Sequence, residues 1–257
     1  MIELYDRYSQ ESQDLHESLV ATGLSQFGVV IDADVFLPDG LVSPFTYYLG
    51  YEKGKPLYFN QVPVPVFWEI LGDNQSARIE DVTQERAVIH YADGLQARLV
   101  KQVDWKDLEG RVRQVDHYNR FGACFATTTY SADSEPIMTV YQDVNGQEVL
   151  LENHVTGDIL LTLPNQSMRC FANKVEFIIF FLQDLGFDSH KLIFNTLATP
   201  FLVSFHHPDK SVSDVLVWQE PLYDAIPGNM QLILESDDVR AKKIIIPNKA
   251  TYERALE

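Results

Sequence analysis

Short apolar runs and helical patterns alternate at the start of the chain, and this alternation predicts α/β structure. Residues 9–22 place Leu15 and Leu19 on one face of a helix, and Gly23 is a residue type that commonly follows a helix end. Residues 27–31 form a short apolar run, which is typical of a strand that is buried on both faces. We therefore expect a helix and then a buried strand near the N-terminus.

The same rhythm returns in the last third of the chain. Asn173 caps a nearly apolar helix that ends at Gly186, and Glu176 stands in the position of a capping box. Further patterns predict strands at residues 192–194, 215–218 and 243–246, and a helix at 229–235. Residues 250–257 have the pattern of a helix that has only begun, so we expect the chain to be a fragment of a longer protein.

Between these two parts, apolar and polar residues alternate with a period of two. Residues 77–172 contain several such segments, separated by turn sequences such as Asp93-Gly94 and Asn145-Gly146. Strands are predicted at about residues 95–105, 123–130, 137–142, 147–152 and 158–163. No helical pattern of ~12 residues separates them, which favours antiparallel pairing.

These patterns predict an α/β fold with an inserted antiparallel β domain. Residues 62–66 contain two prolines, which lack the N–H groups of a strand, so this segment is expected to be a rigid crossing. We expect residues 1–67 and 173–257 to form one interrupted α/β domain, and residues 68–172 to form the inserted sheet.

The charge balance narrows the class of partners. The chain has 257 residues, with 20 Lys and Arg against 37 Asp and Glu, and a formal net charge of -17. An acidic surface repels phosphate backbones, so we do not expect nucleic acid as a partner. The N-terminus lacks the pattern of a signal peptide, and the apolar run at residues 177–182 is far shorter than the ~20 residues of a membrane-spanning helix. We expect a cytoplasmic protein.

Charge is unevenly distributed along the predicted sheet. Lys and Arg occur in its first half and are absent from residues 121–168, where acidic residues remain. Cross-strand pairing on a solvated face explains this pattern, and so does a surface that orients a partner sheet of the same polarity. The candidate interface residues are Arg98, Lys101, Arg111, Arg113, Glu148, Glu152 and Asp158.

Few residues carry recognisable catalytic chemistry. Asp32 and Asp34 follow the first apolar strand; carboxylates at this spacing hold a divalent metal in some sugar transferases, but they also cap turns. His206 and His207 would point to opposite faces of an extended segment and could not easily share a metal ion. Because nucleotide-binding and hydrolase motifs are missing too, we expect no catalytic residue, no metal and no cofactor.

The segment that follows the predicted strand 215–218 is the best candidate for a binding site. In open parallel sheets, crevices form beyond the carboxyl ends of the strands. The side chains that the sequence places there are Trp218, Gln219, Glu220, Tyr223 and Asn229. We expect them to face a ligand or peptide, although packing of Trp218 and Tyr223 in the core would leave the same pattern.

Several segments of the sequence resemble a known family. They are FNQVPVPVFWE at residues 59–69, RLVKQVDW at 98–105, ENHVTGDI at 152–159, and WQEPLYD followed by PGNMQL within 218–232. In this order they resemble the accessory Sec system glycosylation chaperones. Members of this family are the non-catalytic B subunits of the bacterial O-GlcNAc transferase that modifies serine-rich repeat adhesins. The resemblance extends from the first residues to the final helix.

The resemblance implies a fold and a set of partners. The fold would be the first Rossmann-like half of a two-Rossmann (GT-B) glycosyltransferase, interrupted by an extended β-sheet domain. The chain would bind the unfolded adhesin acceptor and stabilise the catalytic A subunit, and the two subunits would meet through their extended sheets. The implied location is the cytoplasm, with room for peripheral association at the inner face of the membrane. Family members are longer, because a second Rossmann-like domain follows.

Two other functions stay open on the residues alone. A metal-dependent nucleotide-sugar transferase would use Asp32 and Asp34, and manganese binding with nucleotide-sugar hydrolysis would reveal it. A carbohydrate-binding β module would use the sheet alone, and saturable glycan binding without a protein partner would reveal it.

Overall fold

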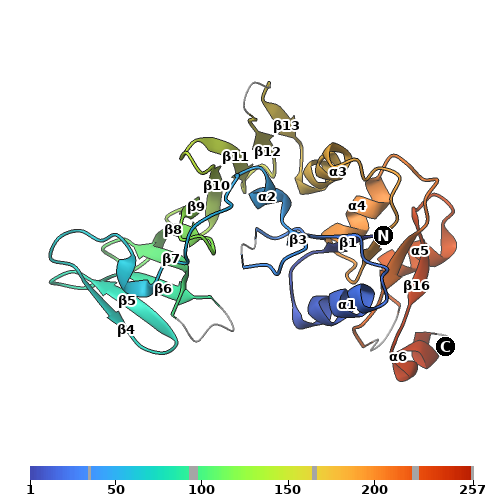
Figure 1. Cartoon of the computed structure of the whole chain (residues 1–257), viewed down its shortest axis with the longest axis horizontal. Coiled ribbons are helices and arrows are strands. Elements are labelled where there is room, and N and C mark those ends of the chain that lie inside the picture. Colours follow the sequence, from blue (N-terminus) through green and yellow to red (C-terminus); the bar gives the residue numbers. More distant parts are fainter. Residues whose placement is uncertain (34–35, 93–97, 164–166, 222–225, 256–257) are drawn as a thin grey trace. The chain divides into compact units, whose positions relative to one another are not determined.

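The computed structural model describes the chain except residues 34–35, 93–97, 164–166, 222–225 and 256–257. Its contacts divide it into two compact units, one formed by Met1–Pro44 with Asn173–Glu257 and the other by Phe45–Ala172. Each unit is built around its own sheet, as Figure 1 shows. A parallel sheet and a separate antiparallel sheet are therefore present, which confirms the expectation of an inserted β domain at this level of detail.

The first unit contains a six-stranded parallel sheet. In spatial order its strands are β16 (Ala241–Ile245), β15 (Asp214–Val217), β14 (Leu192–Phe194), β1 (Ile2–Tyr5), β2 (Phe27–Val30) and β3 (Leu41–Val42). Every residue of β1, β14 and β15 is buried, as expected of strands that are covered on both faces.

The helix α1 (Gln10–Ala21) forms where the sequence predicts it. The hydroxyl of Ser9 accepts a hydrogen bond from the N–H of Ser12 and so caps the first turn. Gly23 has φ +70°, a left-handed conformation that glycine adopts without steric cost. Leu15 and Leu19 pack against the sheet in a cluster that includes Tyr5, Val30, Ile193 and Val215.

Four further helices belong to the first unit. They are α3 (Lys174–Asp184), α4 (Thr199–His206), α5 (Gly228–Glu235) and α6 (Lys249–Ala255). Asn173 caps α3 as expected, because its side chain accepts the N–H of Glu176 (3.1 Å). Contacts join α3 to α4, α4 to β14 and α5 to β16, so α4 and α5 pack on the sheet and α3 packs on α4.

The second unit contains a ten-stranded antiparallel sheet in which sequence neighbours are also spatial neighbours. Its strands are β4 (Glu69–Gly72), β5 (Ser76–Glu80), β6 (Glu85–Tyr91), β7 (Val100–Lys106), β8 (Val112–Tyr118), β9 (Cys124–Tyr130), β10 (Pro136–Gln142), β11 (Glu148–Asn153), β12 (Ile159–Leu161) and β13 (Arg169–Phe171). Two short helices, α2 (Pro44–Tyr47) and η1 (Phe59–Gln61), precede β4 in the chain. The meander predicted from the period-two pattern is confirmed.

Residues 45–67 pack with the antiparallel sheet. Val62 is 3% exposed and lies in the core of that sheet, and Leu57, Phe59 and Val64 pack against the same core. The hydroxyl of Tyr51 donates to the carbonyls of Gln142 and Asp143. The apolar residues of the proline-rich crossing account for this packing, whereas the domain boundary at residues 67 and 68 stays a prediction.

Several elements differ from the sequence expectation. In the antiparallel sheet, the strand predicted at 95–105 is β7 (Val100–Lys106), and β4, β5, β6, β8 and β13 were not assigned individually. Two differences in the first unit change its architecture. No strand was expected at β1, where the charged residue Glu3 interrupts the apolar run. The helix α4 was also not expected, and it places His206 at a helix end rather than in an extended segment. His206 is exposed whereas His207 is 1% exposed, so the two imidazoles lie in different environments. Within the described part of the chain, no helix is long and apolar enough to cross a bilayer.

Candidate functional site at the carboxyl ends of the parallel strands

The order of the parallel strands changes direction between β1 and β14. The chain moves outward from β1 through β2 to β3, and later moves outward on the other side from β14 through β15 to β16. In open α/β sheets, the loops at the carboxyl ends diverge at such a point, and ligands bind in the crevice between them. The residues just beyond β1, β14 and β15 therefore form the candidate site.

Polar side chains from three elements meet at this edge. Asn195 follows β14 directly, and its Nδ2 donates to Ser12 Oγ in α1 (3.2 Å) and to Gln219 Oε1 beyond β15 (3.4 Å). The Ser12 hydroxyl donates to the carbonyl of Arg7 in the loop before α1 (2.9 Å). Because each residue is held by a different element, the sheet architecture fixes the geometry of this cluster.

The predicted site residues occupy different positions at this edge. Trp218 is 6% exposed, Gln219 is half-buried and Glu220 is exposed. Asn229 lies in the first turn of α5 and donates from Nδ2 to the carbonyl of Leu197 (3.2 Å), beyond β14. Tyr223 lies outside the described residues. The structure thus brings Gln219 into the polar cluster and anchors Asn229 to the neighbouring loop.

Three members of the site were not identified from the sequence: Ser12, Asn195 and Thr196. Asn195 and Thr196 come directly after the predicted strand 192–194. The rule that selected Trp218 and Gln219 beyond one strand therefore also selects these two residues beyond its neighbour. Ser12 carries no such signal, because its burial depends on where α1 packs.

The buried side chains of the cluster are uncharged and form hydrogen bonds. Asn195 Oδ1, Thr196 Oγ1 and Trp218 Nε1 are buried atoms without a hydrogen-bond partner in the described part of the protein. Among the described residues, no group of three or more His, Cys, Asp or Glu side chains is arranged to hold a metal ion. Asp32 is exposed beyond β2, and Asp34 lies outside the described residues, so their pairing is not described.

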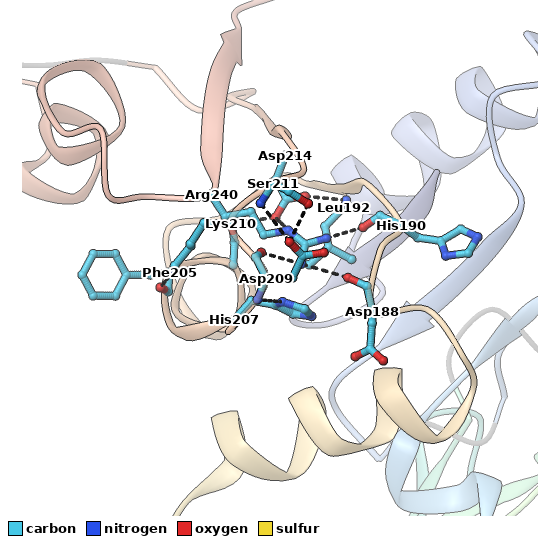
Figure 2. A network of polar contacts seen from close by, with 11 residues as sticks. Asp188, His190, Leu192, Phe205, His207, Asp209, Lys210, Ser211, Asp214 and Arg240 are labelled. Carbon is cyan, nitrogen blue, oxygen red and sulfur yellow. Dashed lines mark hydrogen bonds and ion pairs between the residues drawn. The ribbon is translucent and has the colours of Figure 1, made fainter.

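The opposite, amino-terminal edge of the sheet holds a buried ionic network, shown in Figure 2. Asp214 and Arg240 are both fully buried, with 3.0 Å between Asp214 Oδ2 and Arg240 Nε. Asp214 also accepts hydrogen bonds from the N–H of Leu192 and the hydroxyl of Ser204 (2.8 Å each). The guanidinium of Arg240 donates to three loop carbonyls, those of Asp188, His190 and Asp209.

The contacts of this network connect elements of the fold to one another. Burial raises the pKa of Asp214 above its usual value, although Arg240 and the two hydrogen-bond donors act in the opposite direction. Its contacts are to the starts of strands, to loop carbonyls and to Ser204 of α4, all within the same unit. It therefore ties β14, β15 and β16 together at the edge that lies away from the candidate site.

The candidate interface residues lie in two separate parts of the antiparallel sheet. Arg111 pairs with Asp107 (3.2 Å) and Glu109 (2.9 Å) in the turn between β7 and β8. Arg98 donates to Asn74 Oδ1 (2.7 Å) and lies over the Phe59 ring. Lys101 lies in β7 and Arg113 in β8. The basic half is thus partly neutralised by acids of its own hairpins.

The acidic members lie around β11. Glu148 is exposed at the start of this strand, and Glu152 accepts a hydrogen bond from the Tyr141 hydroxyl (3.3 Å). Asp158 lies in the turn before β12, where it accepts from the Thr156 hydroxyl. Strands β9 and β10 separate this group from β8, so the structure does not bring the basic and acidic members together.

Three exposed apolar side chains, not identified from the sequence, lie next to β4 and β5 in the chain and are called here the apolar surface beside β4. Val66 is 79% exposed and Phe67 is 85% exposed, and Val82 in the turn between β5 and β6 is 90% exposed. Phe67 has φ +75°, a conformation that is unfavourable for a residue with a side chain. The sequence signal was present in the apolar residues that follow Pro65, but it was assigned to a rigid crossing.

Three domain families match consecutive parts of the chain. Their descriptions are GtfB N-terminal domain at residues 2–48, GtfB middle domain at residues 68–172 and GtfB third domain at residues 174–257.

Full-length relatives match throughout the chain. The UDP-N-acetylglucosamine–peptide N-acetylglucosaminyltransferase stabilizing protein GtfB of Streptococcus pneumoniae serotype 4 is 91% identical over 257 residues, which are 100% of this chain and 58% of the relative. The protein of the same name from Streptococcus gordonii is 53% identical, over 100% of this chain and 57% of the relative. The chain therefore spans less than two thirds of the length of these relatives.

Solved structures show the same fold. A chain in the crystal structure of a GtfA/B complex bound to UDP and GlcNAc matches with a TM-score of 0.95 and 53% identity, over 100% of this chain and 58% of that one. The pneumococcal O-GlcNAc transferase GtfA, in complex with UDP and GlcNAc, matches with a TM-score of 0.65 and 12% identity, over 98% of this chain and 56% of that one. At such low identity the second likeness shows a shared fold alone.

Proposed function

Because this chain belongs to the family of the GtfB stabilizing proteins, we propose that it is a non-catalytic subunit of an O-GlcNAc transferase complex. In this role it stabilises the catalytic A subunit and binds the acceptor, a serine-rich repeat adhesin, before accessory Sec export. The observation that carries the proposal is 91% identity along the whole chain to a protein named for stabilising the transferase. The proposed location is the cytoplasm, with peripheral association at the inner face of the membrane.

The strand order supports the finer assignment of the fold. The sequence β3-β2-β1-β14-β15-β16 follows the order of doubly wound nucleotide-binding sheets, with the inserted sheet between β3 and β14. We therefore assign the first unit as the first Rossmann-like half of a GT-B fold, interrupted at residues 68–172 by the extended β-sheet domain. The likeness to a transferase of 12% identity agrees with this assignment at the level of the fold.

Acceptor binding is assigned to the crevice at the carboxyl ends of the parallel strands. Trp218, Gln219, Glu220, Tyr223 and Asn229 are the proposed acceptor-binding residues. The polar cluster around Asn195 supports this assignment, because it lies at the point where α/β sheets of this topology bind ligands.

Assembly with the transferase is assigned to the antiparallel sheet. The proposed interface includes Arg98, Lys101, Arg111, Arg113, Glu148, Glu152 and Asp158. The apolar surface formed by Val66, Phe67 and Val82 adds contact area of the type that interfaces bury. An edge strand such as β4 also offers unpaired backbone groups to a second sheet.

Co-expression with the catalytic subunit tests the function as a whole. We expect the two proteins to co-elute in size-exclusion chromatography and the catalytic subunit to melt at a higher temperature in the complex. This chain alone should transfer no sugar from UDP-GlcNAc to a serine-rich peptide. Transfer by the isolated chain, or separate elution of the two proteins, would contradict the proposal.

A pair of substitutions tests the assembly surface. Phe67→Asp places a charge on the apolar surface beside β4, whereas Val20→Asp places one on the exposed side of α1 in the first unit, where Val20 is 55% exposed. We expect Phe67→Asp to weaken co-elution and Val20→Asp to leave it unchanged. Equal behaviour of the two folded variants would remove β4 from the interface.

A further inference from the structure

We propose that Asn195, Thr196 and Trp218 bind the main chain of an extended peptide through its amide groups. This inference rests on the acceptor-binding function proposed above, and it specifies which chemical group of the acceptor the crevice recognises. Asn195 is 5% exposed and Trp218 is 6% exposed, so both are built into the edge of the sheet rather than displayed on its surface.

The unpartnered atoms of the three residues have complementary roles. Asn195 Oδ1 is an acceptor, Trp218 Nε1 is a donor, and Thr196 Oγ1 is either. Leaving such groups without a partner costs about 1–3 kcal/mol each when they are buried, so three of them on adjacent strand ends call for a partner from outside the chain. The other polar atom of Asn195, Nδ2, donates to Ser12 Oγ and to Gln219 Oε1. These two hydrogen bonds fix the direction of the Asn195 side-chain carbonyl.

The register of the sheet brings the ends of β14 and β15 next to each other. Ile193 pairs with Val215 and Phe194 with Leu216, so Asn195 and Thr196 leave the sheet beside the strand that ends just before Trp218. One peptide unit presents one N–H and one C=O on opposite sides of a short bond. An acceptor oxygen and a donor nitrogen on neighbouring strands therefore match the amide groups of a chain that crosses the strand ends.

Other ligand classes fit the cluster less well. None of the three side chains is charged, and the exposed neighbour Glu220 is acidic, which disfavours phosphate groups. Sugars are commonly recognised by stacking on an accessible aromatic face. The Trp218 side chain is too deeply buried to offer its ring, and only its N–H is left for bonding.

The location of the cluster allows a peptide to reach it. Thr196 and Gln219 are half-buried and Glu220 is exposed, so the cluster borders the surface of the unit. A rotation of the short Thr196 side chain is enough to turn its hydroxyl toward a ligand. Recognition through amide groups is independent of side chains, which suits an acceptor of repetitive, low-complexity sequence.

The test measures binding of two matched peptides to the complex of this protein with its transferase subunit. One is a fluorescently labelled serine-rich peptide, and the other has the same side chains with N-methylated main-chain amides. Fluorescence anisotropy should show clear binding of the first peptide and much weaker binding of the second. Thr196→Val should weaken binding of the first peptide roughly five-fold, the effect of one lost hydrogen bond.

A matched substitution separates recognition from folding. The Thr196 hydroxyl has no partner, so Thr196→Val should not lower the melting temperature. Thr128 in β9 is also buried, but its hydroxyl contacts His117 Nε2 (2.9 Å) and Thr139 Oγ1 (2.8 Å). Thr128→Val should therefore lower the melting temperature and leave peptide affinity unchanged.

The outcomes distinguish this inference from the function on which it rests. If the complex binds neither peptide, the acceptor-binding function itself is wrong. If it binds both peptides equally, or if Thr196→Val leaves affinity unchanged, acceptor binding stands and main-chain recognition by this cluster is wrong. A Thr196→Val variant that loses stability but not affinity would assign the hydroxyl to a structural water, and would also overturn the inference.

Discussion

The parallel and antiparallel sheets of this chain accommodate polar side chains in opposite ways. The parallel unit buries Glu3, Asp214 and Arg240 completely, and each has dedicated contacts. Glu3 Oε2, in the middle of β1, accepts a hydrogen bond from the Tyr5 hydroxyl and lies 2.7 Å from His16 Nδ1. The stability of this unit is therefore concentrated in a few residues whose loss leaves an unpaired charge inside.

The antiparallel unit instead distributes its polar contacts over many strands. A row of side chains crosses β8, β9 and β10 and ends in the turn after β11, with contacts of 2.8–2.9 Å. Its members are His117, Thr128, Thr139 and His154. No charge is needed in this row, because hydroxyl and imidazole groups both donate and accept. Each residue can be replaced at moderate cost.

The turns of the antiparallel unit repeat one design. In four successive hairpins, the first turn residue is a side-chain acceptor that bonds the backbone N–H groups two and four residues later. The fourth residue has a positive φ angle. The pairs of first and fourth residues are Asp107 with Gly110, Asn119 with Gly122, Ser131 with Ser134, and Asp143 with Gly146. Repetition of this turn sets the register of the meander.

Removal of the buried arginine should have the largest effect. In Arg240→Met, Asp214 stays buried without its counter-ion and three loop carbonyls lose a donor. We expect the free energy of unfolding of the parallel unit to fall by about 3–5 kcal/mol. Urea unfolding followed by hydrogen exchange in each unit measures this change.

The control for this prediction is Lys249→Met. Lys249 pairs with Glu253 at 3.6 Å, but both side chains are largely exposed. An exposed pair contributes little, so this variant should unfold like the parent. A small effect of Arg240→Met, or loss of protection in the antiparallel unit alone, would show that the contrast between the two sheets is wrong.

A glycine substitution should have the next largest effect, in the antiparallel unit. Gly122 has φ +85°, and an added Cβ would lie 2.3 Å from the carbonyl oxygen of Lys55. Gly146 occupies the same position of an equivalent turn, with φ +75° and no atom within 4 Å of an added Cβ. We expect Gly122→Ala to cost about 2–4 kcal/mol, because backbone strain and a steric clash add.

The Gly146→Ala variant isolates the conformational part of this cost. It should lose only about 1 kcal/mol, the usual penalty for a side chain in the left-handed region. Thermal unfolding of both variants gives the difference. Equal losses would mean that the segment before η1 moves aside without cost and does not brace the sheet.

Much of the fold can be predicted from the sequence, and the elements that were not predicted have identifiable physical causes. β1 escaped prediction because Glu3 interrupts an apolar run, and burial of this charge depends on Tyr5 and on His16 in another element. α4 escaped because its aromatic and β-branched residues, such as Phe201 and Val203, are typical of strands. In both cases tertiary contacts overrode the local pattern.

Only some residues of the candidate site could be identified from the sequence, again because tertiary contacts decide which side chains meet. Gln219 and Asn229 follow or precede recognisable elements, so the rule for carboxyl ends locates them. Asn195 forms the centre of the cluster, but its importance appears only when α1 and the loop beyond β15 are placed next to it. Chain order does not reveal that neighbourhood.

Histidine titration should have a smaller effect, with one buried histidine responsible in each unit. Burial lowers the pKa of His117 below its usual value, although Asp104 and Asp116 raise it; Lys101 acts with burial. The unfolded chain therefore binds more protons than the folded unit between the lowered pKa and about 6.5. The free energy of unfolding should fall as pH decreases through this window, by at most about 1.4 kcal/mol per pH unit.

His117→Gln should flatten this pH dependence in the antiparallel unit. Burial also lowers the pKa of His207 in the parallel unit, so His207→Gln should flatten the dependence there and not in the other unit. Hydrogen exchange at a series of pH values resolves the two units. A pH dependence that survives both substitutions would assign the titration to other groups.

Replacement of the one serine at the fourth turn position should have the smallest effect, and it should be stabilising. Ser134 has φ +60°, where glycine stands in the three equivalent turns. Ser134→Gly removes a conformational penalty of about 1–2 kcal/mol from the folded state. It also makes the unfolded chain more flexible, which lowers the free energy of unfolding by about 0.5–1 kcal/mol. We expect a net gain of about 0.5 kcal/mol, measured as a higher urea midpoint of the antiparallel unit. Gly146→Ser is the reverse change and should lower that midpoint. If Ser134→Gly destabilises the unit, the serine side chain makes a contact that the glycine turns lack, and the four turns are not equivalent.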